Sequence, residues 1–167
     1  MPIIINWIEL QYQTDNCIEI PLFERSFKLY YVEDVIIKTE WNLLVSDRQV
    51  IENSCWKQLK HYLNNPEETL TVNLKKQGSA FRNKVWAEMC KIPAGQTLTY
   101  SALARQINSG ARAVANACRD NPFPGIIPCH RVVAVSGLGG YMGQTGGKAL
   151  EIKKKLLAGE RHFKREG

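Results

Sequence analysis

Long apolar runs are missing from this 167-residue sequence, since none approaches the roughly 18 residues that a membrane-spanning helix needs. Its first residues, M-P-I-I-I-N-W-I-E-L, lack the basic segment and the small-residue cleavage site of a secretory signal. Internal repeats and low-complexity segments are missing as well. We therefore expect a protein of the cytoplasm without membrane contact, with room for one ample domain or two small ones.

Paired cysteines are also missing. The five cysteines are odd in number and include no C-x-x-C motif, which disfavours a disulfide framework and a structural zinc site, so we expect free thiols. A metal site built from Cys55, His61 and distant ligands stays an alternative, although the spacing of that pair matches no usual zinc pattern. We expect neither a metal nor a cofactor.

Acidic residues are scarce in the second half of the chain. Residues 1–75 hold 7 Lys and Arg against 11 Asp and Glu, whereas residues 76–167 hold 15 against 5. The net charge of +6 therefore comes from the C-terminal half. A basic half of this kind indicates contact with nucleic acid, and a merely solvated basic surface is the alternative.

The first half has the pattern of a sheet. The segments C-I-E-I, F-K-L-Y-Y-V and V-I-I-K-T-E-W alternate or are rich in β-branched and aromatic residues, and Glu33-Asp34 gives a tight turn. Between Asp47 and Leu63, apolar residues recur every four positions, which predicts a helix that Asn64-Asn65-Pro66 ends. Over residues 1–75 we predict a small antiparallel sheet with one covering helix and no chemistry.

The second half has the pattern of short helices. Ser79 and Thr99 can cap two of them, the second over residues 100–107, and a third spans 111–119 after the turn N-S-G. N-P-F-P cannot be helical, and a last helix over about 148–158 ends at Gly159. The predicted fold class is α/β, of the α+β kind. Its C-terminal domain, residues 76–167, is mostly helical, with a winged-helix-like helix-turn-helix.

The third helix, A-R-A-V-A-N-A-C-R, has few long polar side chains with which to read base edges. Small residues let its backbone come close to a partner, which is either a neighbouring helix or a DNA groove. The basic charge favours the groove, and Arg112 is the long side chain that would enter a base stack.

The segment N-P-F-P-G-I-I-P-C-H-R-V-V presents a cysteine between a proline and a histidine. From these residues alone, the thiol is a buried core residue, a metal ligand or a nucleophile. Together with the preceding L-T-Y-S-A-L-A and A-R-A-V-A-N-A-C-R, the segment resembles the O6-alkylguanine-DNA alkyltransferases, also called methylated-DNA–protein-cysteine methyltransferases. The resemblance runs from about Phe81 to Glu160, and P-C-H-R-V is highly specific for that family. The N-terminal half resembles that family only in its length and general character.

The resemblance implies DNA repair by irreversible transfer of the alkyl group from guanine O6, and also from thymine O4, to the protein's own cysteine. Cys129 would be the nucleophile, because a thiolate suits attack on an sp³ carbon. His130 would take its proton directly or through water, and Glu160 in L-L-A-G-E would orient the imidazole. A thioether has no good leaving group, so each molecule acts once and needs neither cofactor nor metal.

Two further residues gain a role from the resemblance. Asn121 would tie the turn to the nucleophile through side-chain hydrogen bonds, with a plain Asx turn as the alternative. Tyr100 would donate to N3 of the guanine and offset the negative charge that grows on the departing base. Plain helix packing is the alternative for that tyrosine.

The resemblance also implies a monomer that binds double-stranded DNA containing alkylated guanine and flips the base out through the minor groove. Arg112 would enter the vacated space, while the alanines of its helix permit close approach. The implied DNA-contacting residues are Ala111, Arg112, Ala113, Ala115 and Arg119. The implied alkyl pocket comprises Tyr100, Pro124, Val132, Tyr141, Met142 and Gly143.

Two features depart from the family pattern. The turn I-N-S-G-A-R is shorter than usual and lacks the proline. Met142 stands where many members have a small residue or serine, and we expect it to narrow the pocket in favour of methyl over bulky groups. Two other functions stay as alternatives: a non-catalytic sensor of alkylated bases, of which the known relatives replace the cysteine, and a cysteine hydrolase, in which the histidine usually lies far away in sequence.

Overall fold

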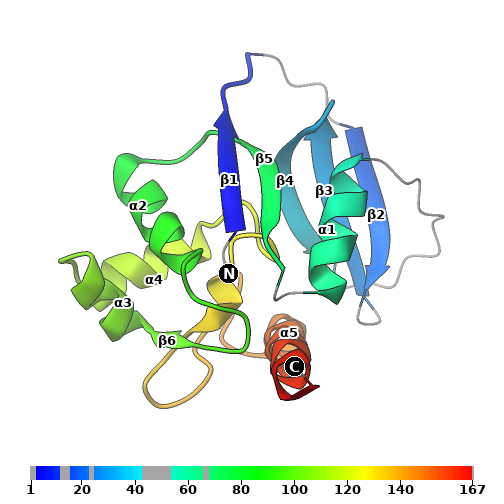
Figure 1. Ribbon diagram of the computed structural model, residues 1–167. Helices are drawn as coiled ribbons and strands as arrows, with labels where there is room; N and C mark the ends of the chain where they lie inside the picture. Colours follow the sequence, from blue (N-terminus) through cyan, green and yellow to red (C-terminus); the bar gives the residue numbers. More distant parts are fainter. Residues whose placement is uncertain (1–2, 12–15, 23–24, 43–53, 66–67, 167) are drawn as a thin grey trace.

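The computed structural model describes residues 3–11, 16–22, 25–42, 54–65 and 68–166. Figure 1 shows a sheet with one helix over it, next to a group of short helices, so the predicted α+β class is confirmed. Among the helices of the described residues, none is both long enough and apolar enough to cross a bilayer.

The N-terminal sheet is mixed. The expectation of a wholly antiparallel sheet is wrong, because β5 pairs in parallel with both β1 and β4. The neighbours β2, β3 and β4 are antiparallel as predicted, with the turn Glu33-Asp34 between β3 and β4. The strand order is β1-β5-β4-β3-β2, and the strands are β1 (Ile3–Ile8), β2 (Asn16–Leu22), β3 (Arg25–Val32), β4 (Val35–Asn42) and β5 (Leu70–Lys75).

Helix α1 (Ser54–Asn64) explains the parallel pairing of β4 with β5. A chain that leaves a strand and returns through a crossover helix re-enters the sheet in the same direction. The helix ends at the predicted stop, and it buries Leu59 and Tyr62. The predicted start at Asp47 lies outside the described residues.

Strand β4 stays paired with β3 from Val35 to Asn42, but it pairs with β5 over only a short stretch. Its register with β5 holds only the pair Ile36 and Leu74. Beyond that pair, the backbone N–H of Thr39 donates to the carbonyl of Pro122 at 3.0 Å. The Thr39 hydroxyl donates to the carbonyl of Pro124 at 2.7 Å. The strand therefore supports the proline-rich turn that leads into the segment containing Cys129.

The C-terminal half contains the predicted helices. Ser79 and Thr99 cap α2 and α3 by accepting hydrogen bonds from backbone amides of Arg82 and Ala102, as predicted. Phe81, in the first turn of α2, is exposed. The elements are α2 (Ala80–Met89), β6 (Leu98–Thr99), α3 (Tyr100–Gln106), α4 (Ala111–Arg119), the 3₁₀ helix η1 (Cys129–Arg131), β7 (Val132–Val133), which pairs in parallel with β6, and α5 (Gly147–Glu166).

Helix α4 is packed on one side. Val114, Ala117 and Cys118 are buried, and the Ala117 carbonyl accepts a hydrogen bond from Trp86 of α2 at 2.9 Å. On the other side, Arg112 is exposed. The short connection from α3 and the open outer face are consistent with the predicted helix-turn-helix.

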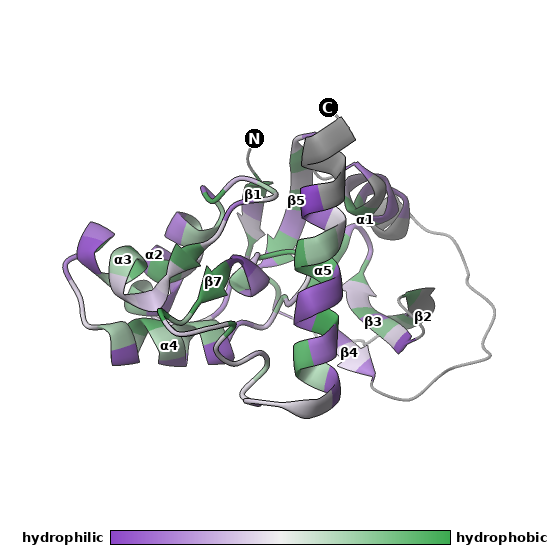
Figure 2. Ribbon diagram, turned by 90° about the horizontal axis from the view of Figure 1, so that it is seen from below, coloured by the Kyte–Doolittle hydropathy of each residue, from purple (hydrophilic) through white to green (hydrophobic). Residues whose placement is uncertain are grey.

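Helix α5 is longer than the sequence analysis expected, because it continues through Gly159 to Glu166. Glu160 therefore lies within the helix and not beyond its end. A glycine inside a helix costs about 1 kcal/mol relative to alanine, and the buried contacts of Glu160 offset that cost. Figure 2 shows hydrophobic and hydrophilic residues alternating along this helix, and Figure 1 shows the helix end-on below the sheet and the helical group.

The sheet ends with β5 at Lys75 and the helices begin with α2 at Ala80. A domain boundary near residue 76 stays a prediction, because Thr39 of the first half makes buried hydrogen bonds with the second half.

Replacement of Thr39 by valine tests the link between β4 and the proline turn. Thr39→Val should lower the free energy of unfolding by about 1–3 kcal/mol, because the buried Pro124 carbonyl loses its donor. Thr71→Val, at an exposed position of β5, is the matched control and should change stability by no more than about 0.5 kcal/mol. Equal urea midpoints for the two variants would contradict the link.

Candidate active site

Cys129 lies at the start of η1, directly after Pro128. Its backbone N–H donates to the Ile127 carbonyl at 2.8 Å, and the N–H of Arg131 donates to the Pro128 carbonyl at 3.0 Å. The prolines of this segment prevent a regular helix, so the chain makes a tight turn that holds the cysteine in place. Only 6% of Cys129 is exposed.

The thiol lines a cavity of about 240 Å³. Of the implied pocket residues, Tyr100, Tyr141, Met142 and Gly143 line this cavity. Its other lining residues are Ala115, Asn116, Cys118, Arg119, Gly140, Gln144 and Thr145. The cavity is therefore bounded by α4 on one side and by the loop around Tyr141 on another.

A second cavity, of about 280 Å³, meets Cys129 from the side of β4. Thr39 and Trp41 of β4 line it together with Asn121 and Pro124. Val132, also implied as a pocket residue, is fully buried in β7 and is not among the described residues that line either cavity. The nucleophile candidate thus has open space on two sides.

Asn121 makes the side-chain contacts that the family resemblance implies. Its amide nitrogen donates to the Ile127 carbonyl at 3.0 Å and to Cys129 Sγ at 3.3 Å. Its side-chain oxygen accepts from the backbone N–H of Phe123 at 2.9 Å. One buried amide therefore fixes the proline turn and also places a donor on the sulfur.

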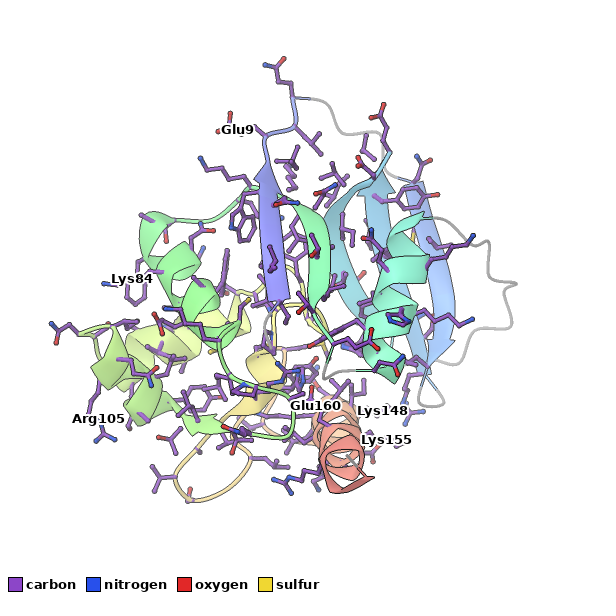
Figure 3. The ribbon with its side chains drawn as sticks, in the orientation of Figure 1. Glu9, Lys84, Arg105, Lys148, Lys155 and Glu160 are labelled. Atoms are coloured by element: carbon purple, nitrogen blue, oxygen red, sulfur yellow. The ribbon has the colours of Figure 1, made fainter. Side chains whose placement is uncertain are left out.

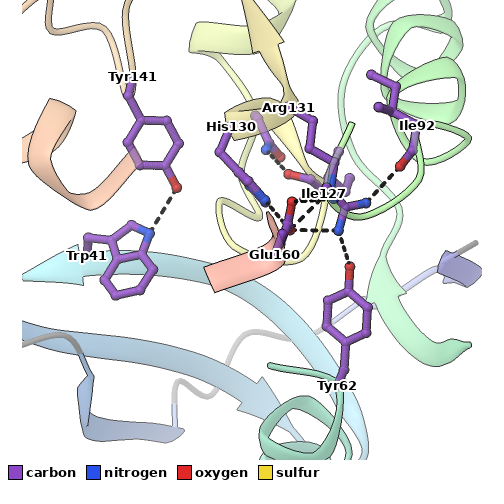
Figure 4. A network of polar contacts seen from close by, with 10 residues as sticks. Trp41, Tyr62, Ile92, Ile127, His130, Arg131, Tyr141 and Glu160 are labelled. Atoms are coloured by element: carbon purple, nitrogen blue, oxygen red, sulfur yellow. Dashed lines mark hydrogen bonds and ion pairs between the residues drawn. The ribbon is translucent and has the colours of Figure 1, made fainter. Parts of the chain in front are cut away.

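His130 and Glu160 form a buried pair, with 2.7 Å between His130 Nε2 and Glu160 Oε1 (Figure 4). The other ring nitrogen, Nδ1, is buried and has no hydrogen-bond partner among the described residues. Burial lowers the pKa of His130, although the Glu160 carboxylate acts in the opposite direction. The ring is therefore neutral, with its proton on Nε2 and a free lone pair on Nδ1.

Arg131 shares the same carboxylate, a role that the sequence analysis missed. Its guanidinium contacts Glu160 Oε1 and Oε2 at 2.8–3.2 Å, and it also donates to the Ile92 carbonyl and the Tyr62 hydroxyl, each at 2.8 Å (Figure 4). Despite burial, His130 and Arg131 lower the pKa of Glu160 to about 2. The sequence did hold a signal for this contact: Arg131 is a charged residue inside the apolar run around P-C-H-R-V-V, and a charged residue that is buried needs a partner.

The thiol itself rests in its neutral form. Burial raises the pKa of Cys129, and the Asn121 amide and the Lys153 ammonium partly oppose that effect. The reactive thiolate therefore has to form as the proton leaves the sulfur, which requires a nearby base.

Tyr100 lies at the start of α3 with its side chain on the first cavity. Burial raises the pKa of Tyr100 to about 12, so the phenol keeps its proton and acts as a donor at neutral pH. Gly139, with φ 72°, packs against it: a Cβ atom there would lie 2.9 Å from the Tyr100 ring. Glycine is required at this position by both the backbone angle and the close approach.

Tyr141 is held from the first half of the chain. The indole nitrogen of Trp41, on β4, donates to the Tyr141 hydroxyl at 3.0 Å (Figure 4). The sequence analysis found no chemistry in residues 1–75, and the contacts of Trp41 and Tyr62 were missed because they join segments far apart in sequence.

The expected DNA-contacting residues lie together on α4. Arg112 and Arg119 are exposed, whereas Ala111, Ala113 and Ala115 are half-buried. Arg119 also pairs with Asp120 at 3.5 Å. Figure 3 shows other basic side chains, among them Lys84 and Arg105, pointing away from the molecule, whereas Glu160 lies among the central side chains.

No group of three or more His, Cys, Asp and Glu side chains is placed to hold a metal in the part of the chain that the structure describes. His61, one half of the alternative metal pair, is exposed and contacts Glu68. The side chain of Cys55 lies outside the described residues.

Known proteins are similar to the part of the chain that contains this site. Residues 80–162 match the family model described as "6-O-methylguanine DNA methyltransferase, DNA binding domain". A methylated-DNA–protein-cysteine methyltransferase of Methanosarcina mazei is 40% identical over 103 residues, 60% of this chain and 62% of that protein. One of Sulfolobus acidocaldarius is 34% identical over 116 residues, 67% of this chain and 72% of that protein.

A solved structure is similar over almost the whole chain. The O6-methylguanine methyltransferase of Mycobacterium tuberculosis superposes with a TM-score of 0.71 at 28% identity, covering 89% of this chain and 94% of that one. The M. tuberculosis protein in complex with DNA gives a TM-score of 0.69 over 87% of this chain and 92% of that one. The chain therefore belongs to the family of the methylated-DNA–protein-cysteine methyltransferases.

Removal of the Glu160 charge tests the buried cluster. Glu160→Gln should lower the free energy of unfolding by about 3–5 kcal/mol at neutral pH, because Arg131 keeps a buried charge without its partner. Glu151→Gln is the control. Glu151 lies on the same helix as Glu160 and forms an exposed ion pair with Arg25 of β3, so its replacement should cost no more than about 1 kcal/mol. Urea unfolding measures both.

The same variant should change the acid stability. The folded-state pKa of Glu160 is lowered from 4.5 to about 2. Its contribution is therefore complete above pH 4.5 and is lost as the pH falls towards 2. Unfolding measurements across this window should show a steep loss in the wild-type protein and a shallower one in Glu160→Gln, and identical slopes would contradict the assignment.

Proposed function

We propose that the protein repairs DNA by transferring the alkyl group from O6 of guanine to its own Cys129. One observation carries the proposal: the thiol lines a cavity, and the next residue in sequence is an imidazole whose Nδ1 has no partner among the described residues and whose Nε2 is bound to a buried carboxylate. A nucleophile, a base and an orienting group are thus adjacent.

In the proposed reaction, the flipped base enters the cavity and presents its alkyl carbon to Cys129 Sγ. The thiol proton passes to His130 Nδ1, directly or through a water molecule, and the imidazolium is stabilised by the Glu160 carboxylate at 2.7 Å. The S–C bond forms as the C–O6 bond breaks, and both electrons of that bond stay with the guanine. Tyr100, still protonated, donates to the base and offsets this charge.

The product fixes the number of turnovers. An S-alkyl cysteine is a thioether without a good leaving group, so the resting thiol does not return and each molecule acts once. Alkyl groups on thymine O4 offer the same kind of sp³ carbon, and we include them as a second substrate.

The DNA surface in this proposal is α4 and its N-terminus. Half-buried alanines let the helix approach a minor groove, and the exposed Arg112 fills the space that the flipped base leaves. Arg119, which lines the cavity, lies where the base would enter. Phosphate contacts of the basic C-terminal half would supply affinity without sequence preference.

Intact mass after incubation with a duplex containing one O6-methylguanine tests the proposal. We expect a gain of one methylene unit, one equivalent per molecule and no turnover, with the modification mapped to Cys129. Cys118→Ser, at the other thiol of the cavity, is the control and should still accept the methyl group, whereas Cys129→Ser should not. Tight binding of the duplex without a mass change would indicate a lesion sensor instead.

Met142 gives a second test of the pocket. It lines both cavities and has a φ of 52°, a left-handed angle that suits glycine and strains a methionine. Met142→Gly should therefore widen the pocket and raise the transfer rate from O6-benzylguanine relative to O6-methylguanine DNA. Val135→Gly, on an exposed loop residue away from the cavities, should leave that ratio unchanged. Equal rates on the two substrates in the wild-type protein would count against a narrowing role.

A further inference from the structure

Lys153 is fully buried, although it opens the run K-K-K, which resembles a solvated face of α5. Helical spacing explains its burial, because Ala149, Ile152 and Leu156 lie on the same side of the helix and are buried as well. The next residue, Lys154, is exposed. One lysine of the run therefore points into the protein while its neighbour points outwards.

The ammonium of Lys153 is saturated by backbone carbonyls. It donates to Val132 at 2.7 Å, Leu138 at 2.7 Å and Gly140 at 2.9 Å. Three donors facing three acceptors require the charged form, since a neutral amine has only two N–H groups. These carbonyls span the loop that follows η1 and leads directly into Tyr141 and Met142.

The charge of Lys153 has no carboxylate partner among the described residues. The buried carboxylate of α5, Glu160, is bound by His130, Arg131 and the N–H of Gly95. The groups that act on the ammonium are the Cys118 and Cys129 thiols, the His130 imidazole and the ring of Tyr100 at 6.0 Å. Burial lowers the pKa of Lys153 to about 8, and both thiols oppose that effect.

We propose that Lys153 is a positioning residue for the nucleophile: its ammonium fixes the cavity loop through three carbonyls, and its unpaired positive charge favours the thiolate of Cys129. This inference rests on the proposed function, in which Cys129 is the nucleophile. A methionine would fill similar space without the cost of burying a charge, so packing alone does not explain a lysine here. A cation without an anion becomes favourable when the adjacent thiol ionises.

The reactivity of Cys129 towards iodoacetamide, followed across pH by peptide mapping, measures the thiolate without DNA. Lys153→Met removes charge and donors, Lys153→Gln keeps donors without charge, and Lys154→Met is the matched surface control. We expect the pH midpoint of Cys129 labelling to rise by about one unit or more in both Lys153 variants, which makes labelling about tenfold slower at neutral pH. The control should keep the wild-type midpoint.

The variants separate the two parts of the role. Equal upward shifts in Lys153→Met and Lys153→Gln support an effect of charge, which a purely structural contact would not produce. Wild-type midpoints in folded Lys153 variants, judged by near-UV circular dichroism, overturn the proposal. If neither variant folds, the wild-type protein decides: a buried charge predicts a midpoint insensitive to salt, and a shift between low and high salt overturns the proposal.

Methyl transfer from O6-methylguanine DNA, measured on the same samples, keeps the two proposals apart. Transfer by the wild-type protein together with unshifted labelling midpoints overturns the role of Lys153 and leaves the proposed function standing. Absence of transfer by the wild-type protein overturns the proposed function, and the role of Lys153 in catalysis falls with it.

Discussion

The buried carboxylate of Glu160 is the point on which the rest of the site depends. It is bound by His130 and Arg131 of η1, while Arg131 also reaches Ile92 and Tyr62. A buried charge is tolerated only with complete partners, so these contacts hold together or fail together. One carboxylate on α5 therefore fixes the positions of η1, α1 and the chain after α2 relative to one another.

The same cluster sets the protonation states at rest. Because burial lowers the pKa of His130 by more than Glu160 raises it, the carboxylate holds the imidazole in one tautomer without keeping it protonated. The thiol of Cys129 is also neutral, since burial outweighs its favourable contacts. In the proposed reaction, charge separation between the thiol and the imidazole is thus confined to the step in which the sulfur attacks a bound alkyl group.

Local patterns in the sequence predicted the helices, the caps at Ser79 and Thr99 and the motif around Cys129, because each depends on neighbouring residues. The parallel pairing of β5 was missed because strand direction depends on a crossover. The end of α5 was misplaced because Gly159 is a usual stop, and contacts distant in sequence hold the helix beyond it. Helical phase would have placed both Lys153 and Glu160 on the apolar side of α5.

The described residues of the N-terminal half supply no group to the proposed reaction, yet several of them support the site. Thr39 holds the proline turn before Cys129, Trp41 holds Tyr141 in the cavity wall, and Tyr62 accepts a hydrogen bond from Arg131. Each contact is a single buried polar bond whose loss leaves a group unsatisfied. If the sheet served only to stabilise the fold, apolar packing against the C-terminal half would be sufficient. These polar contacts instead fix the orientation of particular groups, so the geometry around Cys129 depends on both halves of the chain.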